Sequence, residues 1–509
     1  MPDRCPSRGT TALNADAATP RPPAAGHAAR LPLRPLALLL PLALLAGCGT
    51  LAPDYEQPPL PVSVAYPLDA PLLAGGVPPA LLAWQDYFTD PQLRRLIDSA
   101  LTNNRDLRSA VLRVEEARAS YGIRRADRFP TVGLAVDATR GRTPADLSLT
   151  GKAEVAGQYE AGFGISSWEL DFWGRVRSLE DAALQEYLAT DAARQAFAIS
   201  LVSQVADAYL ALRELDERIR LARETIASRE ESFRIFNRRY QVGATSRLDL
   251  TQVETLLAQA QTLGVQLEQS RAAQAHALAE LVGAPLELAA APDLDRDGGL
   301  QVLRPGLPAE LLNNRPDIIA AERRLKAANA SIGAARAAFF PRITLTASAG
   351  TASAELEGLF DAGSGSWRFM PSLSLPLFDA GRNRASLELA EVRRDLAVAS
   401  YEKTVQTAFR EVADALSAQR WLGEQLRILR GSLATQAERA RLAQLRYDNG
   451  AARYLEVLDA QRELLSAQQQ VVQTRRALLS SQVALYAALG GGSAASAAAS
   501  AATTPSPTE

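Results

Sequence analysis

Histidine and cysteine are almost absent from this chain of 509 residues, which contains two of each. Without a cluster of histidines the sequence offers no zinc site of the usual kind, and a catalytic triad would have to use His276 alone. The two cysteines, Cys5 and Cys48, provide neither a disulfide framework nor a CxxC site. We therefore expect no catalytic residues, no metal and no bound cofactor.

The charge is balanced and aromatic residues are scarce. The formal net charge is −2, so nothing indicates binding to nucleic acid. Aromatic residues make up 6% of the chain, whereas its middle is rich in alanine, leucine, glutamine, arginine and glutamate, a mixture that favours helices. After residue 46 we find no apolar run long enough for a transmembrane helix, so a membrane would have to be crossed by strands.

The first 47 residues have the pattern of an export signal. Arg30 and Arg34 precede an apolar stretch over residues 36–46, which has the length of a signal segment and is too short to span a bilayer. The stretch runs into Leu-Ala-Gly-Cys, which looks like a bacterial lipobox, so we expect a diacylglycerol and an N-acyl chain on Cys48. The alternative is a buried cysteine beside a core helix. Gly49 follows, in place of the aspartate associated with retention in the inner membrane.

The sequence also repeats itself at a spacing of about 207–211 residues. The landmarks that recur are Asn103-Asn104-Arg105 as Asn313-Asn314-Arg315, Phe129-Pro130 as Phe340-Pro341, Gly174-Arg175 as Gly381-Arg382, and Gly243-Ala244 as Gly450-Ala451. Their shared order and similar gaps indicate an internal duplication.

Each half begins with a helix and two strands. The helix (107–127, then 317–338) ends near a Phe-Pro pair, because proline cannot continue it. Alternation of apolar with small or polar residues then predicts strands at 131–139 and 158–166, and again at 342–349 and 367–377. This alternation fits membrane strands and a half-buried soluble sheet equally, and aromatic residues near the strand ends favour the membrane. Loops are expected at 140–156 and 350–366.

Two very long helices complete each half. Residues 176–237 and 384–445 contain no proline, and a helix of roughly 60 residues reaches about 90 Å, too long for one compact globule. Glycine turns then reverse the chain into second helices at 246–282 and 453–489. Paired helices of this length predict a coiled coil or a helical tube.

Four strands are too few to close a membrane barrel, since single-chain barrels need at least eight. An open sheet in lipid would leave unpaired edge groups, each costing several kcal/mol. Copies of the chain must therefore share one barrel. Three copies would supply twelve strands, and the residues alone leave other multiples open.

Several segments, in their order and number, resemble the TolC-like outer-membrane factors of tripartite efflux pumps, in the NodT-type lipoprotein branch. They are Tyr87-Phe88, Asn103–Leu107, Arg113–Arg118, Arg125–Pro130, Trp168–Arg175, Asn314–Ile318 and Leu458–Arg462. The resemblance implies a mainly α fold with internal duplication, in which a trimeric 12-stranded outer-membrane β-barrel continues into a long periplasmic α-helical barrel. It also implies a passive exit duct for drugs or other small molecules, in contact with outer-membrane lipid. The implied partners are a periplasmic adaptor and a proton-driven inner-membrane transporter of the resistance–nodulation–division (RND) type.

The same resemblance assigns sites at the helical turns. It implies adaptor-docking tips at Val242-Gly243-Ala244-Thr245 and Asn449-Gly450-Ala451-Ala452, whose small residues allow close approach. It also implies a periplasmic gate at Leu455, Asp459 and Arg462, which share one helix face, with Asp249 as a further acidic position. By spacing alone, the charged pair would be interpreted as a solvated surface contact.

These inferences divide the chain into successive segments. They are a signal peptide (1–47), an extended segment after the lipidated cysteine (48–85), repeat 1 (86–282), a linker (283–307), repeat 2 (308–490) and a disordered low-complexity tail (491–509). The alternatives are a duct for type I protein secretion, a cell-wall-acting lipoprotein enzyme, and a structural coiled-coil lipoprotein, which would leave the four strands unexplained.

Overall fold

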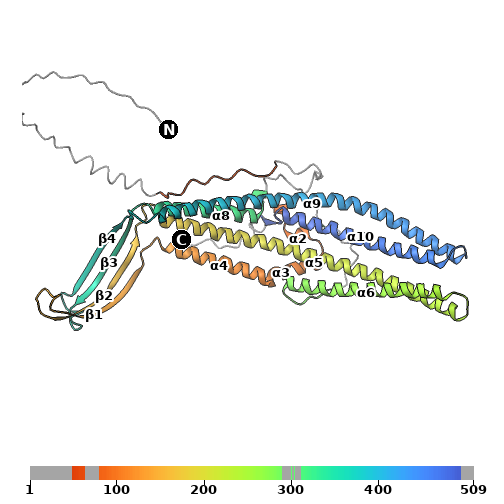
Figure 1. Ribbon diagram of the computed structural model, residues 1–509, viewed down its shortest axis with the longest axis horizontal. Coiled ribbons are helices and arrows are strands. Elements are labelled where there is room, and N and C mark those ends of the chain that lie inside the picture. Colours follow the sequence, from red (N-terminus) through yellow and green to blue (C-terminus); the bar gives the residue numbers. More distant parts are fainter. Residues whose placement is uncertain (1–48, 64–78, 289–299, 301–302, 304–310, 494–509) are drawn as a thin grey trace, which may run out of the picture. The chain divides into compact units, whose positions relative to one another are not determined.

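The computed structural model describes residues 49–63, 79–288, 300, 303 and 311–493, and these residues belong to one compact unit (Figure 1). The expected signal peptide, Cys48, and most of the expected linker and tail lie outside these residues. The first residues of the expected tail are described: Gly491 N donates to Tyr486 O (2.9 Å), and Ser493 Oγ donates to Asn314 O (2.7 Å). These bonds hold the chain to the end of the last helix and to Asn314, beyond the boundary expected at residue 490.

Four strands form one antiparallel sheet in the order β1–β2–β3–β4. They are β1 (Val132–Thr143), β2 (Glu154–Glu169), β3 (Arg342–Ser353) and β4 (Gly365–Ser374). The first loop is shorter than expected, because residues 140–143 pair with residues 154–157 and extend the hairpin. The second is shorter because β3 continues to Ser353. β4 ends before the expected residue 377, because β3 begins at Arg342, which lies opposite Ser374.

One face of this sheet presents apolar side chains that the described part of the chain leaves uncovered. Val132, Leu134 and Val136 on β1 are 64–70% exposed, and Trp367 on β4 is 81% exposed. A soluble protein would bury a contiguous apolar face of this kind. The exposure therefore favours lipid over a soluble layer as the environment of the sheet.

The helices form long pairs and shorter helices that lead into the sheet. Their bounds are η1 (Pro79–Leu81), α2 (Trp84–Tyr87), α3 (Pro91–Asn103), α4 (Arg105–Ala126), α5 (Arg175–Gln241), α6 (Arg247–Val282), α7 (Leu311–Asn314), α8 (Pro316–Ala337), α9 (Arg382–Asp448) and α10 (Tyr454–Ala488). With 67 residues each, α5 and α9 are about 100 Å long. Each begins directly after a glycine in the left-handed region, Gly174 or Gly381, where the chain turns out of the sheet.

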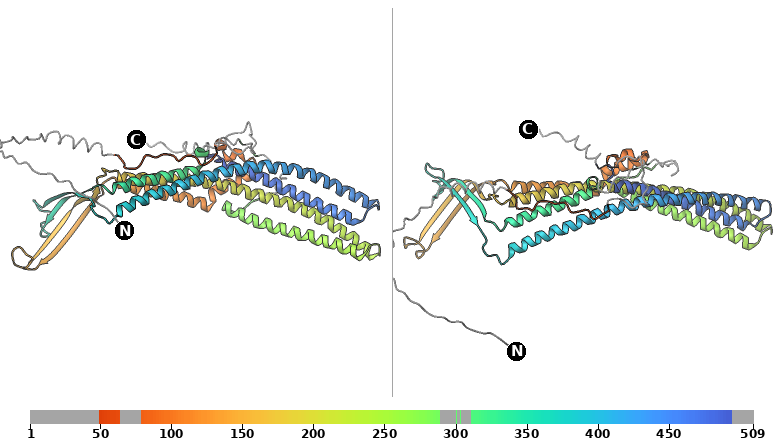
Figure 2. Two further views of the ribbon diagram at one scale, coloured as in Figure 1. Left: turned by 45° about the horizontal axis from the view of Figure 1, so that its top comes forward. Right: turned by 90° about the horizontal axis from the view of Figure 1, so that it is seen from above.

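Within the described unit, the helices follow the order of the strands that they join (Figures 1 and 2). Near the sheet, the contacts run α4–α5–α8–α9, and beyond the ends of α4 and α8 they run α6–α5–α10–α9. The helices of the bundle thus form two layers: one near the sheet, which contains α4 and α8, and one near the turns, which contains α6 and α10. The long helices α5 and α9 run through both layers. The duplication is visible in this arrangement, because α4, α5 and α6 in the first half correspond to α8, α9 and α10 in the second.

The hydrophobic core lies at this halfway level, where α2 and α3 contact the long helices. The ring of Tyr87 stacks on Tyr486 at a centroid distance of 4.3 Å, and its hydroxyl donates to Gln482 O (2.9 Å). Phe88 completes the cluster, and all three aromatic side chains are buried. Fully burying one such side chain contributes about 1.5–3 kcal/mol, so this contact fastens the short helices to the long ones.

One helix of the described residues, α5, contains a stretch that could cross a membrane by its length and composition. This stretch qualifies by its mean hydropathy and is interrupted by polar residues, so it differs from the uninterrupted apolar run that the sequence analysis found absent after residue 46. Part of the stretch, 39%, is buried, and the same helix contacts α4, α6, α8 and α10 along its length. These contacts make α5 a member of the helical bundle.

Candidate gate and docking site at the helical turns

The chain reverses twice between long helices, and the two turns have the same backbone. Gly243 and Gly450 have φ angles of +76° and +68°, which favour glycine. In each turn the N–H after the glycine donates to a carbonyl near the end of the long helix: Ala244 to Arg239 and Ala451 to Arg446, both at 2.8 Å. A Cβ added at either glycine would meet no atom within 4 Å. The sequence-predicted tips are therefore open and free of bulky groups around both glycines.

A cavity of about 480 Å³ lies between the two hairpins, just inside the turns. Leu248 and Asp249 line it from α6, and Arg453 and Leu455 line it from the start of α10. The structure thus brings two of the predicted gate residues, Asp249 and Leu455, to one space. Leu455 also lines a groove of about 1130 Å³ between α9 and α10, together with Asp459.

An aromatic cluster holds the two hairpins together beside this cavity. The ring of Tyr454 lies 4.6 Å from Phe236 and 4.8 Å from Tyr447, and its hydroxyl is hydrogen-bonded to Ser232 Oγ. Burial raises the pKa of Tyr454 above its usual range, so the hydroxyl keeps its proton. Arg239 donates from Nη1 to the Tyr447 hydroxyl (2.5 Å) and so links the first hairpin to the second.

Asp249 caps the start of α6. Its Oδ2 accepts hydrogen bonds from Ser246 N (3.3 Å), Ser246 Oγ (2.6 Å) and Thr245 Oγ1 (3.2 Å), while Ser246 Oγ accepts from Asp249 N (3.1 Å). This reciprocal pattern is a capping box. The hydrogen bond from the Ser246 side chain is the main reason why the pKa of Asp249 lies below its usual range. Arg453, at the start of α10, lowers it further.

Asp459 is the centre of an ion-pair network on α10. Its Oδ1 lies 2.7 Å from Arg462 Nη2, as the shared helix face predicts, and its Oδ2 lies 2.7 Å from Arg439 Nη2 on α9. Arg462 also pairs with Glu463 (3.1 Å). The Asp459, Arg439 and Arg462 side chains are 39–60% exposed, so each pair contributes under about 1 kcal/mol. Sequence reasoning missed Arg439, since no pattern linked it to Asp459.

The duplication points to a further gate candidate that the sequence predictions omitted. Leu248 occupies the position in α6 that Leu455 occupies in α10, and both are exposed, at 67% and 53%. Because both line the same cavity, one chain presents two leucines there. Applying the repeat spacing to Leu455 would have found Leu248.

Arg229 is a buried cation behind the ion-pair network, and sequence reasoning missed it too. Its side chain is 3% exposed, and its Nη2 donates to Leu458 O (3.3 Å). Its Nη1 is buried without a hydrogen-bond partner among the described residues. Burial lowers its pKa, and the nearby charge of Arg462 lowers it further. A mid-helix arginine ordinarily belongs to a solvated face, so no sequence signal marks this position.

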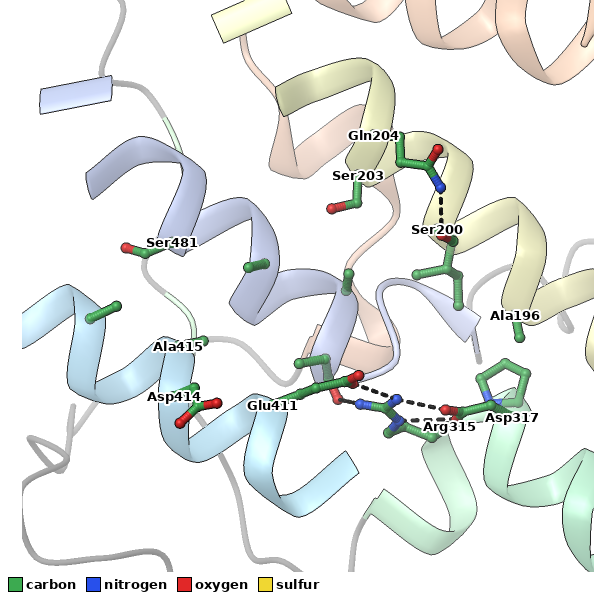
Figure 3. A pocket seen from close by; sticks show the side chains of 16 residues that line it. Ala196, Ser200, Ser203, Gln204, Arg315, Asp317, Glu411, Asp414, Ala415 and Ser481 are labelled. Carbon is green, nitrogen blue, oxygen red and sulfur yellow. Dashed lines mark hydrogen bonds and ion pairs between the residues drawn. The ribbon is translucent and has the colours of Figure 1, made fainter. Parts of the chain in front are cut away.

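Another cavity, of about 620 Å³, lies where the start of α8 meets the end of α10 (Figure 3). Arg315 pairs there with Asp317 (2.6 Å) and Glu411 (2.8 Å), and its Nη1 donates to Ala488 O (2.9 Å). The last carbonyls of a helix need such a partner, and a cation suits the negative end of the helix dipole. The charges shown in Figure 3 therefore join two helix ends.

The first repeat has an equivalent contact between two helix ends. Asn104, at the start of α4, donates from Nδ2 to Leu281 O (2.9 Å), in the last turn of α6. Its Oδ1 accepts from Leu107 N (2.9 Å) and caps α4. The recurring Asn-Asn-Arg landmark thus marks the places where the two layers of helices meet.

Residues 49–63 run beside the start of α5 and along α8. Thr50 Oγ1 is hydrogen-bonded to Ser178 Oγ (2.7 Å), and Asn329 Nδ2 donates to Pro53 O (2.7 Å). A Cβ on Gly174 would lie 2.7 Å from Thr50 Cα, so this glycine permits the close approach. The described chain therefore begins at the end of the helices that leads into the sheet.

Comparisons with known proteins agree with this architecture. The family model described as "Outer membrane efflux protein" matches residues 96–284 and 307–491. The chain is 45% identical over 451 residues to the outer membrane protein OprJ of Pseudomonas aeruginosa, covering 88% of this chain and 94% of OprJ. It is 48% identical over 456 residues to the toluene efflux pump outer membrane protein TtgF of Pseudomonas putida, covering 88% and 94%. The open-state MtrE outer membrane channel of Neisseria gonorrhoeae superposes with a TM-score of 0.80 at 39% identity, covering 87% of this chain and 99% of MtrE.

Proposed function

The chain belongs to the outer membrane efflux protein family, and from this premise we propose that it receives small molecules from a proton-driven RND-type transporter through a periplasmic adaptor. It is a channel and not an enzyme, and it serves as the outer-membrane exit duct of a tripartite efflux system. Its fold is one third of a trimer, in which three four-stranded sheets close one barrel above a helical tube.

One observation supports the duct most directly. The sheet has an uncovered apolar face and two free edges, and it continues without a break into helices about 100 Å long. An isolated chain could not hold such a sheet in lipid, since each unpaired edge group costs several kcal/mol. Shared among three chains, the same sheet encloses a bore.

We propose drugs and small apolar molecules as the cargo class, because the relative TtgF is named for toluene efflux. The test is the drug and solvent susceptibility of a deletion strain, with the neighbouring transporter gene intact and deleted. We expect susceptibility to rise on deletion, and no further rise when both genes are removed. Unchanged susceptibility, together with loss of a secreted protein from the medium, would instead support the type I secretion duct.

We propose that Cys48 carries the lipid anchor. Support comes from the lipobox-like tetrad and from the packing of Thr50 against Ser178 and Gly174, where the helices lead into the sheet. In a Cys48→Ser variant we expect labelling by radioactive palmitate to disappear. Retained labelling would refute lipidation at this cysteine.

We propose that the leucines and the ion pairs inside the tips narrow the duct at rest. Leu455 and Leu248 would occlude the bore. Asp459 would hold α10 to α9 through Arg439, and Arg462 would support Asp459 from the same helix. Asp249 would contribute mainly by fixing the start of α6, because its Oδ2 is engaged in the capping box. The open glycine turns at 243 and 450 would receive the adaptor.

A further inference from the structure

We propose that β4 of one chain pairs with β1 of the next chain in a register that the internal duplication fixes, with Leu373 opposite Val136 of the next chain. β1 and β4 are the two edges of the sheet, so closing the barrel must join them. The inference rests on the trimeric barrel stated above. It adds which residues meet at the closure.

The hairpins identify equivalent residues in the two halves. Val132 and Ile343 each lie two residues after the proline of a Phe-Pro pair. In the first hairpin Val132 faces Ile165, and in the second Ile343 faces Leu373. Ile165 and Leu373 therefore occupy equivalent positions in β2 and β4.

The pairing of β2 with β3 joins the two hairpins of one chain. It serves as the template for the pairing of β4 with β1 of the next chain. In the template, Ile165 on β2 faces Ala347 on β3. Ala347 lies four residues after Ile343, as Val136 lies four residues after Val132, so these two residues are equivalent. If the closure repeats the template, Leu373 faces Val136 of the next chain. The antiparallel ladder then continues with Ser372–Asp137, Pro371–Ala138, Met370–Thr139, Phe369–Arg140 and Trp367–Arg142.

A second route, starting from the other end of the strands, gives the same register. Trp168 and Leu375 each lie six residues before a recurring Gly-Arg pair. Trp168 faces Leu345 on β3, which corresponds to Leu134 on β1. Leu375 should therefore face Leu134 of the next chain, two steps along the ladder from the Leu373–Val136 pair. The agreement between the two routes is informative, because the register of β2 against β3 shifts between Ile165 and Trp168. The two routes start from residues on opposite sides of this shift.

The faces of the two strands provide an independent check. The exposed apolar row uses even-numbered residues on β1, such as Val136, and odd-numbered residues on β4, such as Leu373. The proposed register sets these two rows opposite each other, whereas a slip by one residue would place Leu373 against Asp137 and mix the two faces. It also provides a partner strand for Leu375 and Leu377, which alternate like strand residues but lie beyond the end of β4.

The helices support the same junction. In the order α4–α5–α8–α9, the helix before β1 and the helix after β4 are the two outer ones, so closing the sheet brings α4 of one chain beside α9 of the next. Both helices leave apolar side chains exposed for such a contact: Val111, Leu112 and Ile123 on α4, and Leu389, Val392 and Leu396 on α9.

The register can be tested by disulfide trapping in outer membranes. Ser372→Cys is combined in one chain with Ala135→Cys, Asp137→Cys or Thr139→Cys, and Cys48 is retained in every variant. Directly opposite residues have Cα atoms about 4.5–5.5 Å apart, within disulfide range, whereas partners shifted by two residues are about 7–8 Å apart. After mild oxidation, we expect the covalent trimer to be most abundant for Ser372→Cys with Asp137→Cys on a non-reducing gel.

The highest yield with Ala135→Cys or Thr139→Cys would overturn the register. Absence of any cross-link, in variants that still form non-covalent trimers and confer resistance when reduced, would overturn the pairing of β4 with β1. If the unsubstituted chain formed no trimer, the assembly itself would be refuted. Should Asp137→Cys prevent insertion, Leu373→Cys with Val136→Cys tests the same register on the lipid face, with Ala138→Cys as the shifted control.

Discussion

The two hairpin turns of the chain share a backbone and differ in their side chains. Both use a left-handed glycine and the same closing hydrogen bond. In the first turn, Ser246 and Asp249 form a capping box, whereas Arg453 starts the second helix without a side-chain cap. The equivalent arginines also diverge: Arg239 reaches the Tyr447 hydroxyl, while Arg446 pairs with Glu456 (2.8 Å) in its own hairpin.

The proposed docking requires an open turn, and both repeats retain one. The proposed gate requires ion pairs, and here the repeats differ. The charged network occurs in the second repeat alone: Gln252 and Thr255 occupy the positions of Asp459 and Arg462. The two repeats thus share similar tips, and the ion pairs of Asp459 are present in the second repeat.

The largest effect is expected from bulk at the turns. Gly450→Trp and Gly243→Trp should each reduce drug resistance to that of a deletion strain, because the side chain would fill the space that an adaptor needs. Gly→Ala at the same positions carries a similar backbone strain, about 1–2 kcal/mol, without the bulk, and should retain most of the resistance. Minimum inhibitory concentrations measure both. Full resistance in the two Trp variants would exclude the tips from docking.

The second largest effect is expected at the proposed gate, where the two repeats differ in charge. Asp459→Asn combined with Arg462→Leu should raise single-channel conductance in planar bilayers, because it removes the Asp459–Arg439 pair between α9 and α10 together with the Asp459–Arg462 pair within α10. The exposed Asp459–Arg439 pair that joins these helices contributes up to about 1 kcal/mol, so the open population should rise by at most about fivefold. The matched control, Gln252→Ala with Thr255→Ala, should leave the conductance unchanged. An equal rise in both variants would show that charge is not what closes the duct.

A smaller effect is expected on the contact between the hairpins. Arg239→Leu should broaden the distance distribution between spin labels placed on α6 and α10 near the turns, since it removes the bond to the Tyr447 hydroxyl. Arg446→Leu should leave that distribution unchanged, because its partner Glu456 lies in the same hairpin. Double electron–electron resonance measures both variants. Equal broadening would mean that the two arginines act alike.

The smallest effect concerns the capping box and its dependence on pH. Ser246→Ala should speed amide exchange at the start of α6 about fivefold at pH 7, as expected for a cap worth about 1 kcal/mol. The pKa of Asp249 is lowered in the folded chain, so its contribution is complete above the ordinary pKa of about 3.9 and is lost as the pH falls through the lowered value. Arg453→Ala should leave the start of α10 unaffected. Exchange that is corrected for its intrinsic pH dependence and stays constant below pH 4 would contradict this account.

Much of the architecture follows from local rules that the sequence carries. Proline-free stretches fixed the long helices, a recurring glycine fixed each turn, and alternation placed the strands within a few residues of their observed ends. The repeated landmarks revealed the duplication, and too few strands required an assembly. These features depend on neighbours along the chain, so a pattern in the sequence suffices to find them.

Tertiary structure decided the contacts between distant residues. The sequence placed Asp459 and Arg462 on one face, but only the packing of α9 on α10 brought Arg439 to the same carboxylate. Packing also buried Arg229, an arginine that local sequence would place in water. The ends of the strands depended on where a partner strand began, which is why β4 stops at Ser374. Such distances are set by the register of whole elements, and one element's sequence does not contain that information.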